Sequence, residues 1–176
     1  MTIRSYKQIS TKKGDKGTSS DYSNNQYSKD DILFTVLGNV DELTSLLGVT
    51  YHYSDFKEII KDVQKKLQDI NSLIATTDEF VRKNLYQIDI KDIKALESYE
   101  EELMKTTLIK PVFVLPGSDA TKESGYLDLS RSVARRCERS LVTFVRVNQR
   151  DDLHDSLKFM NRLSDLLFIM ARNKSD

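Results

Sequence analysis

The fold is decided by the stretch Tyr126-Leu-Asp128-Leu-Ser-Arg131-Ser-Val-Ala-Arg135-Arg136-Cys137-Glu138-Arg139-Ser-Leu141-Val-Thr-Phe144. Apolar residues recur in it every three or four positions, which predicts a helix over about 121–147 with a buried seam of Tyr126, Leu129, Val133, Cys137, Leu141 and Phe144. A second seam is charged, since Asp128, Arg131, Arg135 and Glu138 follow one another at similar steps. The helix therefore has one side for a core and another side whose role must be identified.

The same periodicity predicts four further helices on either side of this stretch. They span about 29–53, 56–74, 89–108 and 152–173, and Ser54 is the expected N-cap of the second. The connections between them are short. Five helices of this kind favour an all-α fold, a five-helix bundle, in a single domain over residues 1–176.

Two segments lie outside this helical pattern. Residues 10–30 lack apolar periodicity, and we expect an ordered loop or a mobile arm there. Pro111 and Pro116-Gly117 enforce a break, and the apolar residues 112–115 between them are too few for a helix. We expect an extended connection there and not a β-strand, because no second strand-like run exists to pair with it.

The composition argues against several classes of function. The chain has 27 basic and 27 acidic residues, so nothing suggests non-specific nucleic-acid binding. No apolar run approaches the roughly 18 residues of a membrane span, and the N-terminus has no apolar signal core, so we expect a cytoplasmic protein. The lone Cys137 suits a reducing compartment, and His52 and His154 without a Glu-x-x-His motif give no case for a carboxylate-bridged metal site.

The polar head Thr11-Lys12-Lys13-Gly14-Asp15-Lys16-Gly17-Thr18-Ser19-Ser20 is the first candidate for chemistry. Its two glycines let the backbone approach a ligand closely, and its lysines and hydroxyls supply the charge and donors that a polyphosphate needs. It does not have the Gly-x-x-x-x-Gly-Lys-Ser/Thr pattern of a P-loop. A phosphate-binding loop and a flexible lysine-rich tail both remain open.

The charged seam is the second candidate, and it also admits two interpretations. Taken alone, it is a solvent-facing set of ion pairs that contribute about 0.3–0.5 kcal/mol each. However, the last helix carries Asn161, Ser164 and Asp165, and a short connection makes it an antiparallel neighbour, so polar groups of both helices can meet in one pocket. Asp41 is a carboxylate among apolar positions of the first helix and favours an arginine partner.

Four blocks of the sequence, in order, resemble the PduO-type ATP:cob(I)alamin adenosyltransferases. They are Thr11-Lys-Lys-Gly-Asp-Lys-Gly17, Gly38-Asn-Val-Asp-Glu-Leu43, Phe113-Val-Leu-Pro-Gly117, and Arg131-x-x-x-Arg135-Arg136-x-Glu138-Arg139 followed by Asn161-Arg-Leu-Ser-Asp165. The resemblance spans nearly the whole chain. It implies a ferritin-like five-helix bundle with an N-terminal nucleotide-binding loop over residues 1–28, and a homotrimer whose active sites lie between subunits.

The resemblance also implies an activity. The 5′-deoxyadenosyl group of ATP is transferred to the cobalt of cob(I)alamin, a corrinoid, and triphosphate leaves. Mg²⁺ is held through the ATP phosphates and not by protein ligands. No nucleic acid or membrane takes part, and a reductase that supplies electrons is a candidate partner.

Individual roles follow by position from the same resemblance. The ATP contacts are Thr11, Lys12, Gly14, Asp15, Lys16, Gly17, Thr18, Ser19 and Lys29, together with Arg136, Glu138 and Asn161. Arg135 matches an arginine at the phosphates of the reacting centre. Asp41 and Arg131 match a pair that bridges subunits and shapes the corrinoid site, and Phe113 matches the aromatic that displaces the lower axial base of cobalamin.

The sequence departs from the family pattern at three places. Residues 21–28 contain no glycine and no basic residue near Gln26, the connection from Phe113 to Arg131 is longer than usual at residues 118–124, and Asp128 stands where a histidine is frequent. Two other classes of function stay open. One is a non-catalytic ATP-binding regulator on the same fold, and the other is a helical-bundle interaction module.

Overall fold

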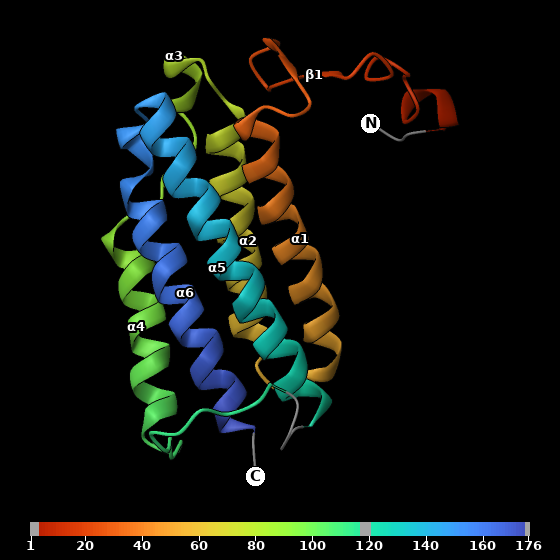
Figure 1. Cartoon of the computed structure of the whole chain (residues 1–176). Coiled ribbons are helices and arrows are strands. Elements are labelled where there is room, and N and C mark those ends of the chain that lie inside the picture. The colour runs from red at the N-terminus through yellow and green to blue at the C-terminus, as the bar shows by residue number, and fades with distance from the viewer. Residues whose placement is uncertain (1–3, 117–120, 175–176) are drawn as a thin grey trace.

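A computed structural model describes residues 4–116 and 121–174, and these residues form a helical bundle. Its long helices are α1 (Ile32–Tyr53), α2 (Lys57–Ala75), α4 (Ile90–Met104), α5 (Lys122–Asn148) and α6 (His154–Asn173). The shorter elements are η1 (Tyr6–Gln8), β1 (Thr18–Ser20), β2 (Gln26–Ser28), α3 (Glu79–Arg82) and η2 (Asp151–Leu153). Figure 1 shows the long helices side by side, with α5 packed against α1 and α6, α2 against α1, and α4 against α6. The predicted all-α five-helix bundle is confirmed.

The core forms where the apolar seams of the long helices meet. On α1, the side chains of Val36, Val40, Leu43 and Leu47 have no exposed surface. The predicted seams of α2 and α6 are also buried, except for the partly buried Phe56, Ile59 and Leu157. Among the described residues, α1 is also the one helix long and apolar enough to cross a membrane by length and composition. One such helix is weak evidence, and the burial of its seam between neighbouring helices is that expected of a bundle core.

The predicted seam of α5 was wrong by one position near its start. Leu129 is 51% exposed, whereas Leu127 is fully buried. The buried positions continue through Ser130 and Ala134 to Cys137. Small residues there allow close approach to α1, and the Oγ atoms of Ser130 and Thr50 lie 3.2 Å apart in a buried hydrogen bond. Periodicity in apolar residues alone misses a seam that contains serine and alanine.

Two helix boundaries were also wrong. Ser54 is not the N-cap of α2: it ends α1, and its Oγ donates to Glu123 Oε1 at 2.6 Å, while Phe56 occupies the N-cap position. The helix predicted over 89–108 ends at Met104. The hydroxyl of Thr107 donates to the carbonyl oxygen of Leu103 at 2.7 Å, and such local side-chain bonds compete with continuation of a helix.

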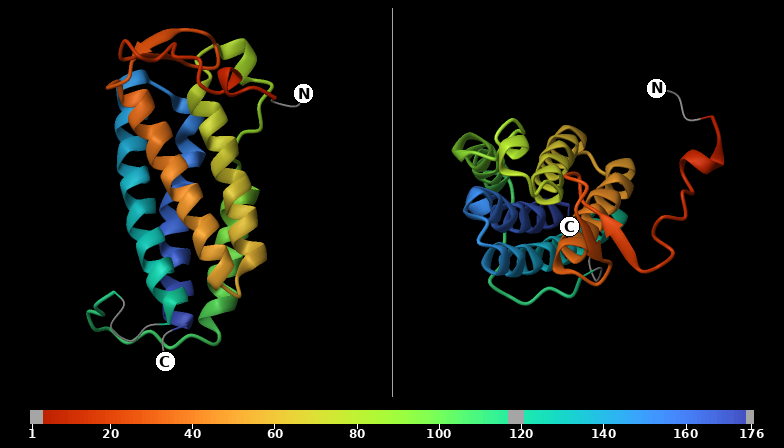
Figure 2. Two further views of the ribbon diagram at one scale, coloured as in Figure 1. Left: turned by 90° about the vertical axis from the view of Figure 1, so that its right-hand side faces the viewer. Right: turned by 90° about the horizontal axis from the view of Figure 1, so that it is seen from above.

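The polar head is an arm followed by a hairpin. Strands β1 and β2 pair antiparallel, with Thr18 opposite Ser28 and Ser20 opposite Gln26. Figure 2 shows residues 4–17 running outward from the top of the bundle, with the hairpin above the helix ends. The strands were not predicted, because three residues are too few to show an alternating pattern.

The connection between α4 and α5 agrees with expectation where it is described. Residues 112–115 form no strand. The longer segment predicted at 118–124 lies outside the described residues as far as residue 120, and α5 begins at Lys122 with Thr121 as its N-cap, whose side chain accepts from the Ser124 N–H.

Candidate functional site

The loop before the hairpin is built around two glycines. Gly17 has φ +79°, a conformation that favours glycine. A Cβ on Gly14 would lie 2.8 Å from Nζ of Lys29, so the absence of a side chain lets that lysine pack against the loop backbone. The Lys29 N–H also donates to the carbonyl oxygen of Gly17 at 2.8 Å. The structure thus joins Lys29 to the predicted loop.

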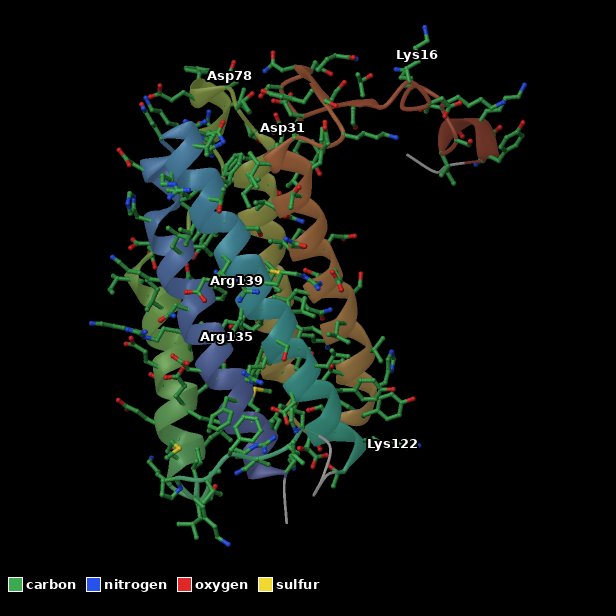
Figure 3. All side chains as sticks on the ribbon, in the orientation of Figure 1. Lys16, Asp31, Asp78, Lys122, Arg135 and Arg139 are labelled. Carbon is green, nitrogen blue, oxygen red and sulfur yellow. The ribbon has the colours of Figure 1, made fainter. Side chains whose placement is uncertain are left out.

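The remaining predicted loop residues lie before, between and after these two glycines in the chain. Thr18 and Ser19 lie half-buried on β1, while Asp15 and the lysines are exposed. Figure 3 shows Lys16 on the arm, beyond the top of α1. One largely exposed polar segment therefore contains the predicted residues Thr11, Lys12, Gly14, Asp15, Lys16, Gly17, Thr18 and Ser19.

The central turns of α5 present the predicted arginines. Arg135 and Arg139 are exposed (Figure 3). Arg136 forms an ion pair with Glu42 of α1. Asp41, beside that glutamate, is exposed, and Arg131 lies near another carboxylate, that of Asp128. Within one chain, the predicted Asp41–Arg131 pair is not formed.

Glu138 and Asn161 are brought together as predicted. The amide nitrogen of Asn161 donates to Glu138 Oε1 at 3.0 Å. Its amide oxygen accepts from Arg162 Nη1 at 2.9 Å, and Arg162 Nε in turn donates to Glu97 Oε1 at 3.0 Å. With a donor on one side and an acceptor on the other, only one orientation of the Asn161 amide satisfies both neighbours.

This orienting role of Arg162 was not predicted. The sequence signal was its position inside the Asn161–Asp165 block, but the partner, Glu97, lies on another helix and is not marked by spacing. Ser164, which was expected to face the pocket, is buried and donates to the carbonyl oxygen of Asn161 at 3.0 Å, so its role is structural.

A large cavity lies at the opposite end of the bundle from the hairpin. Its volume is about 820 Å³, and residues 106–116 form one wall while α5 and α6 form the other. Phe113 and Arg131 both line it, as predicted for one subsite, and Phe113 is 88% exposed. Phe168 adds a second aromatic ring.

A buried charged cluster lines the same cavity. Asp128 is 3% exposed, forms an ion pair with Arg172, and lies 3.5 Å from Arg131 Nε. Two arginines therefore face one carboxylate. Among the described residues, the Nε atoms of Arg131 and Arg172 have no hydrogen-bond partner. Arg172 was missed from the sequence, because a basic residue in the last turn of a helix is ordinarily read as a favourable charge near the helix C-terminus.

The predicted residues do not all converge within one chain. The loop with Lys16 lies at one end of the bundle (Figure 3), and residues 106–116, which line the cavity, lie at the other (Figure 1). The 27-residue helix α5 runs between these ends and is about 40 Å long. One copy of the chain thus supplies separate parts of the predicted site.

Three titratable groups among the described residues have strongly raised pKa values, namely Lys66, Cys137 and Glu100. Burial raises the pKa of Cys137 to about 12, and its thiol donates to the Asn39 carbonyl oxygen. This makes it a packing residue and not a nucleophile. Burial, with a smaller contribution from Asp165, raises the pKa of Glu100 to about 7. The described residues contain no group of three or more His, Cys, Asp or Glu that could hold a metal ion.

Comparison with known proteins covers nearly the entire chain. A family model described as cobalamin adenosyltransferase matches residues 9–174. The human corrinoid adenosyltransferase MMAB is 37% identical over 172 residues, which cover 93% of this chain and 67% of the human protein. A corrinoid adenosyltransferase of Citrobacter freundii is 33% identical over 167 residues and is matched over 93% of both chains.

Solved structures agree in fold. A variant of the PduO-type ATP:corrinoid adenosyltransferase from Lactobacillus reuteri, complexed with cobalamin and ATP, superposes with a TM-score of 0.84 at 28% identity, over 94% of this chain and 92% of that one. Another variant of the same enzyme, complexed with ATP, gives a TM-score of 0.82 over 92% and 91% of the two chains. Sequence and fold thus agree over almost the full length, and this chain belongs to the cobalamin adenosyltransferase family.

Proposed function

We propose that this protein transfers the 5′-deoxyadenosyl group of ATP to the cobalt of cob(I)alamin. The observation that carries this function is the match over nearly the whole chain, in sequence and fold, to corrinoid adenosyltransferases, one of them complexed with both cobalamin and ATP. In the reaction, a cobalt–carbon bond forms at C5′ and the C5′–oxygen bond breaks. The electron pair of that bond leaves with triphosphate.

The loop of residues 11–19 and Lys29 bind the triphosphate of ATP in this proposal. The contacts of Lys29 with Gly14 and Gly17 bring its amine close to the backbone of the loop, and an anionic ligand requires both kinds of group. The oxygen atoms of Thr18, Ser19 and Asp15 are of the kind that Mg²⁺ prefers, so the segment suits a magnesium ion held mainly by the phosphates. When bound, that ion neutralises charge on the leaving triphosphate.

Glu138 and Asn161 bind the nucleoside part. The hydrogen bond between them uses one carboxylate oxygen and one amide N–H. A second carboxylate oxygen and a second N–H remain, so the pair offers an acceptor and a donor side by side. Arg136 lies two residues before Glu138 on α5 and pairs with Glu42 of α1, and in this proposal it contacts the nucleotide once this exposed ion pair exchanges for ligand.

Arg135 stabilises the leaving group. It is exposed on α5, so its guanidinium is available to phosphate oxygens. Negative charge accumulates on triphosphate as the C5′–oxygen bond breaks, and a fixed cation at that point lowers the barrier. No general base is needed, because no proton is removed in the transfer.

The 820 Å³ cavity is the corrinoid subsite in this proposal. The exposed ring of Phe113 at its wall occupies the place of the lower axial base. Removing that ligand makes the reduction of cob(II)alamin to cob(I)alamin easier, and a separate reductase supplies the electron. The arginines around Asp128 fix the polar side of the cavity.

The complete site requires more than one copy of the chain, and we infer a homotrimer. The separation of the loop from the cavity within one chain supports this arrangement, as does the exposure of Asp41 on α1, where Arg131 of another copy can reach it. The enzyme is cytoplasmic, acts away from membranes and nucleic acid, and forms one domain over residues 1–176, with residues 1–28 as the nucleotide loop and 29–176 as the bundle.

Incubation with ATP, Mg²⁺ and chemically reduced cobalamin tests the function. We expect the visible spectrum of adenosylcobalamin to appear. Calorimetry with ATP and Mg²⁺ distinguishes the rival classes: binding without product would indicate a non-catalytic regulator, and no binding would indicate an interaction module.

A further inference from the structure

The turn of the N-terminal hairpin is tied to the end of α2. Asp21, which follows β1 directly, is 6% exposed. Its carboxylate accepts from the Asn25 N–H at 2.8 Å and from the hydroxyl of Thr77, just beyond α2. The Thr77 hydroxyl in turn accepts from the side-chain amide of Asn25 at 2.8 Å. Thr77 thus joins both sides of the turn to the bundle.

Further bonds hold the same turn. The Ser23 hydroxyl oxygen accepts from the N–H groups of Thr77 and Asp78, at 3.2 and 2.9 Å. The Tyr22 N–H donates to the carbonyl oxygen of Ala75 at 2.8 Å. Figure 3 shows Asp78 at the top of the bundle, beside the hairpin. Because these partners include backbone groups at the end of α2, the turn cannot shift without leaving several donors unpaired.

The charge state of Asp21 matches this role. Burial by itself would raise the pKa of Asp21, but hydrogen bonds from Thr77 and Asn25 outweigh it and lower the pKa below its ordinary value. The carboxylate is therefore ionised and acts as an acceptor at neutral pH.

We propose that Asp21, Ser23 and Thr77 are positioning residues that hold the ATP loop in its binding conformation before ATP arrives. Asp21 fixes the end of β1, which carries Thr18 and Ser19. Strand β2 is paired with β1, and the residue after it, Lys29, donates to Gly17. Fixing the turn thereby fixes the segment from Gly14 to Ser19 relative to the bundle. The inference rests on the proposed nucleotide role of that segment.

The physical consequence is a lower cost of binding. Ordering a loop residue on binding costs backbone entropy, and a segment that is already ordered loses less of it when the ligand binds. The hydrogen bonds of Asp21, Ser23 and Thr77 should therefore affect the affinity for ATP and leave both the corrinoid subsite and the transfer step unchanged.

Thr77→Val is the main test, since valine keeps the shape and removes the hydroxyl. We expect the KM for ATP to rise about tenfold, as for the loss of one or two hydrogen bonds that hold the turn. The kcat at saturating ATP and the KM for cob(I)alamin should stay within about twofold of the wild-type values, and Thr77→Ser should restore the KM for ATP. Ser23→Ala provides a second, milder variant if Thr77→Val folds poorly.

Tyr22→Ala is the matched control, because its side chain lies in the same turn but is 74% exposed. It should leave the KM for ATP unchanged. An unchanged KM in both Thr77→Val and Ser23→Ala would overturn the proposal, and so would a parallel fall in kcat and in both affinities. Calorimetry compares the ATP affinities of the same variants without turnover, so the role of Asp21, Ser23 and Thr77 can be tested even if adenosyl transfer fails.

Discussion

Replacing Glu100 by glutamine should make the stability of the protein less dependent on pH. Glu100 lies on α4 against α6, and its Oε1 is buried with no hydrogen-bond partner among the described residues. Burial and the nearby Asp165 raise the pKa of its carboxyl to about 7, from an ordinary value of 4.5, although Arg162 partly opposes them. Glutamine reproduces the neutral form of this side chain at every pH.

The sign follows from where the proton binds. Between pH 4.5 and 7 the folded protein holds the proton more tightly than the unfolded chain, so the wild-type protein loses stability as pH rises through this range. At about 1.4 kcal/mol per pH unit, the raised pKa sets a ceiling of roughly 3 kcal/mol. Because the side chain keeps partial solvent access, screening reduces the expected loss to about 1 kcal/mol.

Urea unfolding followed by circular dichroism at pH 5 and pH 8, at one protein concentration, measures this difference. Glu100→Gln should match the wild type at pH 5 and exceed it by about 1 kcal/mol at pH 8. The exposed neighbour Glu101→Gln should give no pH-dependent difference. A variant that is less stable than the wild type at pH 8, or equally shifted at both pH values, would refute the reasoning.

Three further substitutions test the site. Phe113→Ala should lower turnover from cob(II)alamin with a reductant far more than turnover from pre-reduced cob(I)alamin. An equal loss would contradict the proposal that Phe113 displaces the lower axial base. Arg162→Met should raise the KM for ATP about tenfold, because the Asn161 amide loses the hydrogen bond that orients it. Lys158→Met, which breaks an exposed ion pair on the same helix, should leave this KM unchanged. Equal effects of the two substitutions would show that Arg162 does not orient Asn161. Asp41→Asn should weaken corrinoid use more than ATP binding and loosen the oligomer in sedimentation, and equal loss of both affinities would argue against subunit bridging.

The bundle was predictable because each long helix is specified by a pattern of residues close together in the sequence. Apolar residues at three- and four-residue steps located the long helices, and Thr121 and Asn173 were placed within a residue of the observed ends of α5 and α6. The errors arose where side chains decide the outcome by distant contacts. Ser54 was assigned to the wrong helix because its partner, Glu123, lies far along the chain.

The site was predictable as a list of residues but not as an arrangement. The antiparallel helices predicted that polar groups of α5 and α6 meet, as Glu138 and Asn161 do. The family resemblance implied that Phe113 and Arg131 belong to one subsite, and both line one cavity. The buried ion pair of Asp128 with Arg172 was not predicted, because a basic residue in the last turn of a helix has an ordinary explanation as a charge near the helix C-terminus. The Asp41–Arg131 pair, which the family resemblance implies between subunits, stays a prediction.

The most direct test of the central claim is product analysis of a single reaction with ATP, Mg²⁺ and pre-reduced cob(I)alamin. The proposed transfer breaks the C5′–oxygen bond, so adenosylcobalamin and intact triphosphate should form in equal amounts, with no ADP. Arg135→Ala should lose both products together while keeping its helical circular dichroism spectrum. Release of ADP or phosphate without adenosylcobalamin, or bound ATP that yields no product, would contradict the account.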